Sequence, residues 1–214
     1  MKESTYTPGH SDVSRRFMAR RSLETHAEFI RPYVKSNSHV LDCGCGPGTI
    51  SAGIAAIAVD GSVHGIDFSR HQIDEARQMH RLQNLSFDFA SVYELPYEDH
   101  RFDIVLAHAL FEHIGNPLEA LREIDRVLAP GGFVGLCSPD FAAFVLTPET
   151  KRLRDAFSQY RRIQEFNGGD TLAGRRLLTW LCDAGFTPLK TQGRCENYSY
   201  ASKKSPAIQS VRIC

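Results

Sequence analysis

The sequence predicts an α/β protein built on a doubly wound, mostly parallel sheet. Three observations support this prediction: five short apolar runs that read as strands, helical patterns that separate them, and a glycine loop that turns the first strand into a helix. With 214 residues, 42% of them hydrophobic, the chain is long enough for one sizeable core but not for two ordinary enzyme domains. We therefore expect a single compact domain.

Five apolar runs between residues 39 and 137 are the expected strands. In chain order they are His39–Asp42, Ser62–Asp67, Leu85–Phe89, Phe102–Ala107 and Phe133–Cys137. The fourth run is so apolar that both of its faces should be covered by other elements. We therefore expect this strand in the middle of the sheet.

Capping residues and glycines mark the expected helices. Ser69 can cap one helix, with Gln72 as the second half of a capping box. Another helix is expected to end at Gly185, because glycine suits the left-handed position after a helix. Beyond it, Phe186–Gln192 should form a sixth strand, and the Arg-rich stretch 147–165 is read as a further helix.

The segment 1–37 precedes the first strand and is the first of two expected regions. Residues 10–31 have a helical pattern that includes five arginines. One interpretation is an outer helix that packs on the core and exposes its basic face to solvent. The other is a lid over the active site. Residues 38–214 are the second region, which carries the sheet and the ligand-binding site.

Composition narrows the expected partners. Lys plus Arg equals Asp plus Glu, at 25 each, so no global field draws the protein onto nucleic acid or an anionic membrane. The first ten residues lack the apolar core of a signal peptide, and no window reaches the roughly 18–20 apolar residues that span a bilayer. We expect a small-molecule substrate, no nucleic-acid partner and no membrane insertion.

The six cysteines lack the paired spacing of a zinc site and the density of a secreted scaffold, which favours a reducing, cytoplasmic location. Cys43 and Cys45 flank Gly44 and raise the question of a metal or redox site. Small side chains that fit a tight glycine loop are the simpler explanation, and we expect no bound metal.

The glycine loop is the main indication of a ligand. Gly44, Gly46 and Gly48 follow the first strand, where missing side chains let backbone N–H groups approach a ligand. The preceding Asp42 would repel a pyrophosphate and attract an ammonium group. The dinucleotide fingerprint also places its third glycine one residue later than Gly48. The methionyl group of S-adenosylmethionine therefore fits this loop better than NAD does.

Two further strand ends carry expected cofactor contacts. Asp67 ends the second strand, where its carboxylate can accept hydrogen bonds from both ribose hydroxyls, although NAD sites use the same device. The turn 90–95, after the third strand, lies where an adenine ring would rest. These positions matter because a parallel sheet binds its ligand beyond the carboxyl ends of its strands.

Five segments resemble, in order and spacing, the successive motifs of class I S-adenosylmethionine-dependent methyltransferases, especially the ubiquinone/menaquinone-biosynthesis group. They are Val40–Thr49, Gly65–Ser69, Tyr93–Tyr97, Phe102–Val105 and Arg126–Gly132. The resemblance is strong over residues 38–140. It implies a Rossmann-like sheet of strand order 3-2-1-4-5-7-6, in which the seventh strand is short, at 207–214, or missing from a truncated chain.

The resemblance also implies S-adenosyl-L-methionine as the cofactor and assigns residues to it. Asp42, Gly44 and Gly46 would line the methionyl and ribose region, Asp67 the ribose and Phe68 the adenine. The full expected set is Asp42, Gly44, Cys45, Gly46, Gly48, Thr49, Asp67, Phe68, Gln72, Ser91, Val92 and His108.

Two members of this set carry alternatives. Gln72 would approach the adenosine edge, or else it only completes the capping box with Ser69. Many relatives place an aspartate after the third strand to accept the adenine amino group, whereas this chain has Ser91. The Ser91 hydroxyl or the Val92 backbone would then substitute. His108 would sit at the end of the fourth strand near the sulfonium.

Methyl transfer is an in-line displacement, so the protein mainly supplies alignment and, for an O–H or N–H acceptor, a place for the proton. His108 and His113 follow the fourth strand, with Glu112 between them, and either imidazole can act as a general base near neutral pH. Both histidines can equally well only shape the pocket. Asp140, after the fifth strand, is a second candidate, and Tyr6 and His10 would arrive from the N-terminal lid.

Methyl transfer to a small-molecule acceptor is therefore the leading hypothesis, for a monomer or a homodimer. The main alternative is a non-catalytic S-adenosylmethionine-binding protein or partner subunit. A nicotinamide-dependent oxidoreductase is disfavoured by Asp42 and the early third glycine. An RNA methyltransferase is disfavoured by the absence of a basic excess.

Overall fold

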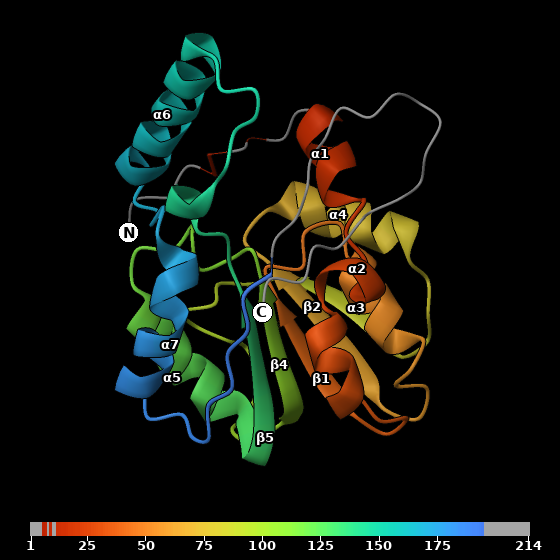
Figure 1. Cartoon of the computed structure of the whole chain (residues 1–214). Coiled ribbons are helices and arrows are strands. Elements are labelled where there is room, and N and C mark those ends of the chain that lie inside the picture. The colour runs from red at the N-terminus through yellow and green to blue at the C-terminus, as the bar shows by residue number, and fades with distance from the viewer. Residues whose placement is uncertain (1–5, 8, 10–11, 195–214) are drawn as a thin grey trace.

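The computed structural model describes residues 6–7, 9 and 12–194, and its core is a five-stranded parallel sheet (Figure 1). The strands lie in the order β3-β2-β1-β4-β5. Their bounds are β1 His39–Cys43, β2 Ser62–Asp67, β3 Leu85–Phe89, β4 Phe102–His108 and β5 Leu128–Cys137. All four strand pairs are parallel, with Asp42 opposite Gly65 and Leu106. The predicted α/β class and the order of the first five strands are confirmed.

Helices cover both faces of the sheet, as a doubly wound fold requires. One face buries apolar residues of three helices, which are α2 (Leu23–His26), the 3-10 helix η1 (Glu28–Tyr33) and α3 (Thr49–Ala55). A fourth helix, α4 (Arg70–Met79), packs on β2 and β3. The other face is covered by α5 (Pro117–Val127) and α7 (Ala173–Asp183). The alternation along β1 shows this division, because Val40 and Leu41 belong to the cores on opposite faces.

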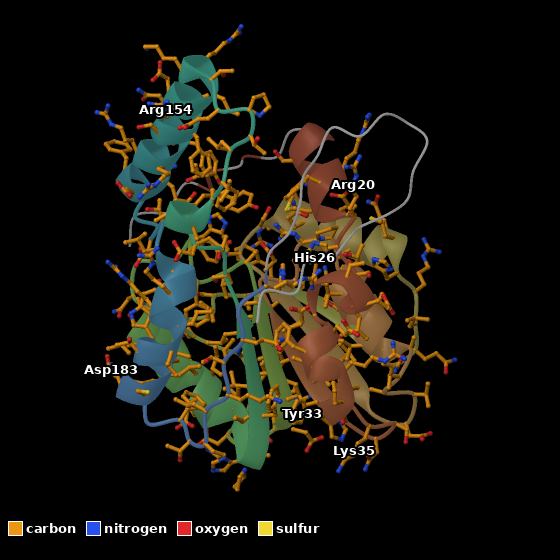
Figure 2. The ribbon with its side chains drawn as sticks, in the orientation of Figure 1. Arg20, His26, Tyr33, Lys35, Arg154 and Asp183 are labelled. Atoms are coloured by element: carbon orange, nitrogen blue, oxygen red, sulfur yellow. The ribbon has the colours of Figure 1, made fainter. Side chains whose placement is uncertain are left out.

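Two helices lie beyond the carboxyl end of the sheet, at the upper end in Figure 1. They are α1 (Asp12–Met18) and α6 (Lys151–Phe166), on opposite sides of the strand ends. A second 3-10 helix, η2 (Phe141–Ala143), leads from β5 toward α6. Tyr33 and Lys35, which precede β1, lie at the lower end in Figure 2, so the strands run upward toward α1 and α6.

The prediction of a sixth strand is wrong for the described residues. Phe186–Gln192 forms no strand, and β5 is the outermost strand of the sheet on that side. Pro188 lies inside this segment and has no N–H to donate to a neighbouring strand. In the expected strand order the neighbour of the sixth strand is the seventh, whose predicted position at 207–214 lies outside the described residues.

Two other elements differ from the prediction. The N-terminal pattern over 10–31 is not one helix, because Ser22 starts α2 with a capping box in which it and Thr25 exchange hydrogen bonds. Strand β5 begins at Leu128, directly after α5, whereas the predicted fifth strand begins at Phe133. The extra residues are accommodated by a register shift between Phe102 and Ile104 of the partner strand. Within the described residues, no helix is long and apolar enough to cross a membrane.

Candidate functional site

The glycine loop at the end of β1 is tied to β2 by its backbone. The Gly44 and Cys45 amides both donate to the Ile66 carbonyl, at 2.8 and 2.9 Å. Gly48 has a left-handed backbone with φ of 74°, and a Cβ there would collide with the ring of Phe87. Gly46, by contrast, has φ of 53° and open space where its Cβ would be. The loop therefore presents bare backbone at Gly46.

Asp67, at the end of β2, lies against this loop. Its Oδ2 accepts a hydrogen bond from the Gly46 amide at 3.0 Å, and its Oδ1 accepts one from the Ser69 amide at 2.9 Å. The two amides fix the orientation of the carboxylate. An ionised carboxylate can only accept hydrogen bonds, so Asp67 presents an acceptor group beside the loop.

Asp42 lies inside the sheet beneath the loop, with 2% of its surface exposed. Its Oδ2 accepts a 2.6 Å hydrogen bond from the Ser51 hydroxyl of α3. The pKa of Asp42 is raised to about 6, chiefly by burial and also by the charge of Asp67, while the Ser51 hydrogen bond opposes the increase. Asp42 therefore anchors the start of α3 as well as placing a carboxyl group under the loop.

Gln72 is the clearest sign of a missing binding partner. Ser69 caps α4 by accepting from the Gln72 amide at 3.4 Å, but the Gln72 side chain does not return the bond. It is 3% exposed, and neither its side-chain oxygen nor its nitrogen has a hydrogen-bond partner among the described residues. Buried amides are normally paired, because an unpaired one costs roughly 1–3 kcal/mol.

The predicted adenine region combines exposed rings with a polar turn. Phe68 is 53% exposed and stacks on Phe89, with ring centroids 5.3 Å apart. In the turn after β3, the Ser91 hydroxyl accepts from the Tyr93 amide at 3.2 Å, while Val92 is buried. The Ser91 hydroxyl is thus partly engaged, and its proton is left for another acceptor.

His108, the last residue of β4, faces α2. Its ring lies edge-on to that of His26, with 5.5 Å between centroids, and Figure 2 shows His26 near the carboxyl ends of the strands. The buried Nδ1 of His108 has no hydrogen-bond partner among the described residues. Burial lowers the pKa of His108 to about 3, and the charges of Arg21, His26 and Arg194 act in the same direction. The ring is therefore neutral at working pH.

His113 is held in one tautomer by its neighbours. Its Nδ1 lies 2.8 Å from the Gln164 side-chain nitrogen, which can only donate, so Nδ1 accepts. In the neutral ring the proton is then on Nε2, which lies 3.7 Å from Oε1 of Glu112. Burial and the charge of Arg21 lower the pKa of His113 to about 4. The Tyr6 ring lies 4.8 Å from the imidazole.

Glu112 was not among the predicted site residues, although it lies between the two histidines. Its carboxylate is buried and accepts a 2.8 Å hydrogen bond from the Ser138 hydroxyl, just after β5. Burial raises the pKa of Glu112 to about 7, while a backbone hydrogen bond, Ser138 and the charge of Arg21 oppose that increase. The only local signal was a carboxylate beside a strand end, since its partners come from distant parts of the chain.

Other candidates are engaged elsewhere. Asp140 binds Arg175 at 2.6 Å and caps η2. Burial raises the pKa of Asp140, but its hydrogen bonds and the charge of Arg175 outweigh burial and hold that pKa below the usual range. Cys43 and Cys45 are buried, and burial raises the pKa of both thiols. The part of the chain that the structure describes holds no group of three or more side chains suited to a metal.

The N-terminal segment reaches the site through Tyr6 and Arg21. Burial raises the pKa of Tyr6 to about 12, with the charge of Arg21 opposing and those of Glu112 and Asp67 adding to the shift. Tyr6 therefore lies near both the glycine-loop side and the Glu112 side. The next residue, Thr7, accepts a 3.0 Å hydrogen bond from Asn167 after α6. His10 lies outside the described residues.

A separate cleft of about 500 Å³ lies between α6, α7 and the start of α5. Its lining includes Arg161, Arg176 and Trp180. It backs onto the Glu112 turn, because the Asp170 amide at its edge donates to the Glu112 carbonyl. The cleft is distinct from the strand-end site, whose residues it does not include.

Comparison with known proteins adds a family to this geometry. A family profile described as a methyltransferase domain matches residues 34–185. The chain is 31% identical over 194 residues to an uncharacterized methyltransferase of Schizosaccharomyces pombe, covering 86% of this chain and 69% of that protein. It is 32% identical over 109 residues to the demethylmenaquinone methyltransferase of Alkalihalophilus pseudofirmus, covering 49% and 46%. The chain spans about half the length of several other curated relatives that it matches.

Solved structures agree on the fold. A Bacillus halodurans protein superposes with a TM-score of 0.64 at 23% identity, covering 81% of this chain and 73% of that one. A SAM dependent methyltransferase from Aquifex aeolicus gives a TM-score of 0.57 at 19% identity, with coverages of 75% and 89%. At these identities the likeness concerns the architecture of the chain.

Proposed function

The chain belongs to the S-adenosylmethionine-dependent methyltransferases, and from that premise we propose that it transfers a methyl group to a small-molecule acceptor. The balanced charge of 25 basic and 25 acidic residues supports this acceptor class, because a nucleic-acid substrate usually calls for a basic surface. The absence of a nucleic-acid partner, the cytoplasmic location and the monomeric or homodimeric state stay predictions.

The buried, unpaired amide of Gln72 is the observation that carries the cofactor assignment. Together with the unpaired Nδ1 of His108, it leaves polar atoms at the strand ends that a ligand with hydroxyls and ring nitrogens would satisfy. We assign Gln72 to the adenosine edge, so the capping-box interpretation of its side chain is replaced. When bound, S-adenosylmethionine supplies a methyl group on a sulfonium, which is already an activated leaving group.

The remaining assignments follow the position of each residue. Asp67 is proposed to bind the ribose hydroxyls, because the Gly46 and Ser69 amides fix its carboxylate at the end of β2 beside the glycine loop. Phe68, Ser91 and Val92 are proposed to bound the adenine. The glycine-loop residues and their neighbours would face the methionyl group, and they are Asp42, Gly44, Cys45, Gly46, Gly48 and Thr49. His108 is proposed to lie near the transferred methyl group.

The segment 1–37 is proposed to act as a lid on this site. The support is that Tyr6 lies 4.8 Å from His113. The Tyr6 hydroxyl lies 3.4 Å from Sδ of Met18 in α1. Thr7 is bound to Asn167 on the far side, so residues 6–7 connect the α1 side of the site to the α6 side. Such a segment would exclude water from the transferring methyl group.

Calorimetric titration with S-adenosylmethionine, S-adenosylhomocysteine and NAD tests the cofactor site. Asp67→Ala should weaken binding of both adenosyl ligands roughly 10- to 150-fold, because hydrogen bonds to a charged group contribute about 1.5–3 kcal/mol. Asp60→Ala is the matched control, since Asp60 is exposed in the turn before β2. Equal affinities in wild type and Asp67→Ala would show that the cofactor site is misplaced.

A labelled-methyl assay against a panel of small metabolites tests the acceptor class. We expect transfer to at least one member by the wild-type protein and reduced transfer by Asp67→Ala at subsaturating cofactor. Preference for NAD over the adenosyl ligands would contradict the proposal. Tight cofactor binding with transfer only to a nucleic acid or protein fraction would overturn the small-molecule assignment.

A further inference from the structure

We propose that Glu112 is a catalytic residue that accepts the proton of an O–H or N–H acceptor during methyl transfer. This inference rests on the proposed function and names the chemistry of its acceptor side. Three observations carry it: the fixed placement of Glu112 in the turn after β4, the engagement of the neighbouring imidazole, and the Ser138 hydroxyl that holds one carboxylate oxygen.

Glu112 is fixed from both its backbone and its side chain. Its carbonyl accepts hydrogen bonds from the Gln164 side chain at 2.6 Å and from the Asp170 amide at 3.0 Å. The preceding Phe111 is fully buried in the core formed with α5. With Oε2 bound to Ser138, the carboxylate has few orientations available, as a proton acceptor in a reacting site requires.

The groups around the carboxylate come from every element that packs on it. His113 is its chain neighbour, Tyr160 comes from α6, Tyr6 from the N-terminal segment and Arg21 from the turn before α2. The tyrosines and His113 are neutral at working pH, because burial raises the pKa of each phenol and lowers that of the imidazole. Arg21 is the single cation in this group, and it lowers the pKa of Glu112 without cancelling the effect of burial.

The two histidines are less suited to this role. Nδ1 of His113 already accepts from Gln164, and its other nitrogen carries the proton in that tautomer. His108 has a free Nδ1, but an imidazole with a pKa of about 3 holds a proton too weakly to remove one efficiently near neutral pH. Glu112, with a pKa of about 7, is matched to the working pH.

The transfer step balances with Glu112 as the base. The acceptor lone pair forms a bond to the methyl carbon, and the carbon–sulfur bond breaks with its electron pair going to sulfur. The acceptor proton moves to the Glu112 carboxylate, which becomes a neutral carboxylic acid and later returns the proton to solvent. The step consumes one sulfonium and one carboxylate, and no oxidant or reductant is needed.

The ionisation of Glu112 can be measured without an acceptor. Infrared difference spectra between wild type and Glu112→Gln, both saturated with S-adenosylhomocysteine, should show one protonated carboxyl band that disappears with a midpoint near pH 7. Ser138→Ala should move that midpoint upward by about one unit, because it removes a hydrogen bond that favours the charged form. A midpoint below about 5, the range of an ordinary glutamate, would overturn the proposal.

The transfer assay tests the catalytic role with a panel of phenols and amines as probes. Glu112→Gln should reduce transfer by roughly 100- to 10,000-fold, while S-adenosylmethionine affinity stays within about twofold of wild type. The wild-type rate should rise through pH 7 and level off above it, and Ser138→Ala should shift that rise to higher pH. Glu98→Gln, a change at an exposed turn, is the control and should leave rate and profile unchanged.

The outcomes separate the two proposals. Transfer by Glu112→Gln within threefold of wild type, or a Ser138→Ala profile at the wild-type pH, rejects Glu112 as the base and leaves the proposed function standing. A wild-type protein that fails to bind S-adenosylmethionine rejects the proposed function instead. If Glu112→Gln does not fold, the Ser138→Ala profile still decides, because a structural role for Ser138 would change the rate without moving the profile.

Discussion

Arg126 of α5 fastens the loop that follows β3 to the body of the domain, and its replacement by methionine is a test of that role. One edge of its guanidinium donates to both carboxylate oxygens of Glu123, at 2.8 Å each. The other donors reach the carbonyls of Leu95 at 3.0 Å and Tyr97 at 2.8 Å, and the Asp99 carboxylate at 2.9 Å. Glu123 in turn accepts from the Leu95 amide at 2.9 Å.

The expected loss can be built from these contacts. Arg126→Met keeps the apolar stem but removes the side-chain donor of the Tyr97 carbonyl, at a cost of roughly 1–2 kcal/mol. The Leu95 carbonyl keeps the Tyr97 amide as a donor at 2.8 Å, so the loss of its bond to Arg126 costs only about 1–1.5 kcal/mol. The pair with Asp99, whose side chain is 65% exposed, contributes at most about 0.5 kcal/mol because solvent screens it. We expect unfolding free energy to fall by about 2–4 kcal/mol, which lowers Tm by roughly 4–16 °C in a domain of this size.

Chemical denaturation and thermal melting of three variants measure this effect. Arg126→Lys should be intermediate, because one ammonium cannot reproduce the planar fork that serves both carbonyls and both carboxylate oxygens. Arg122→Met is the control, since Arg122 is exposed on the same helix. The reasoning is refuted if Arg126→Met costs less than about 1 kcal/mol, or if Arg126→Lys is as stable as wild type.

Two further predictions concern the site itself. Gly48→Ala should destabilise the protein by about 1–3 kcal/mol more than Gly131→Ala. Both glycines have positive φ, but only a Cβ at position 48 would meet the Phe87 ring. Equal losses of unfolding free energy in denaturant titrations would mean that the ring moves aside. The pKa of Glu112 is raised from 4.5 to about 7, so its stabilising contribution is fully present below pH 4.5 and is lost as pH rises through 7. The unfolding free energy of wild type relative to Glu112→Gln should therefore fall by about 3 kcal/mol between pH 4 and 8, and a constant difference would contradict the buried, protonated state.

The sheet was predictable because its signals are local. Each of the five strands is a short apolar run followed by a turn or helix, and strand order follows from the resemblance to known motifs. The sixth strand failed because an edge strand depends on its neighbour rather than on its own pattern. Phe186–Gln192 has no described partner and contains Pro188, so its residues do not pair.

The site divides in the same way. Asp67, His108 and His113 could be selected from the sequence because each lies at or just after a strand end. The contacts that define their chemistry join distant residues: Ser138 binds Glu112 across 26 positions and Gln164 binds His113 across 51. No local pattern shows which face of α6 contacts the turn after β4, and so neither the tautomer of His113 nor the environment of Glu112 was available from the sequence.

Burial keeps the histidines beside the proposed base uncharged. His108 and His113 have pKa values lowered to about 3 and 4, chiefly by burial. An imidazolium at either position would repel a bound sulfonium, and charges in a buried site act on each other strongly. Glu112 instead supplies a negative charge above pH 7 and loses it on taking the acceptor proton. Methyl transfer then removes one positive and one negative charge together, and no new charge has to be buried at the site.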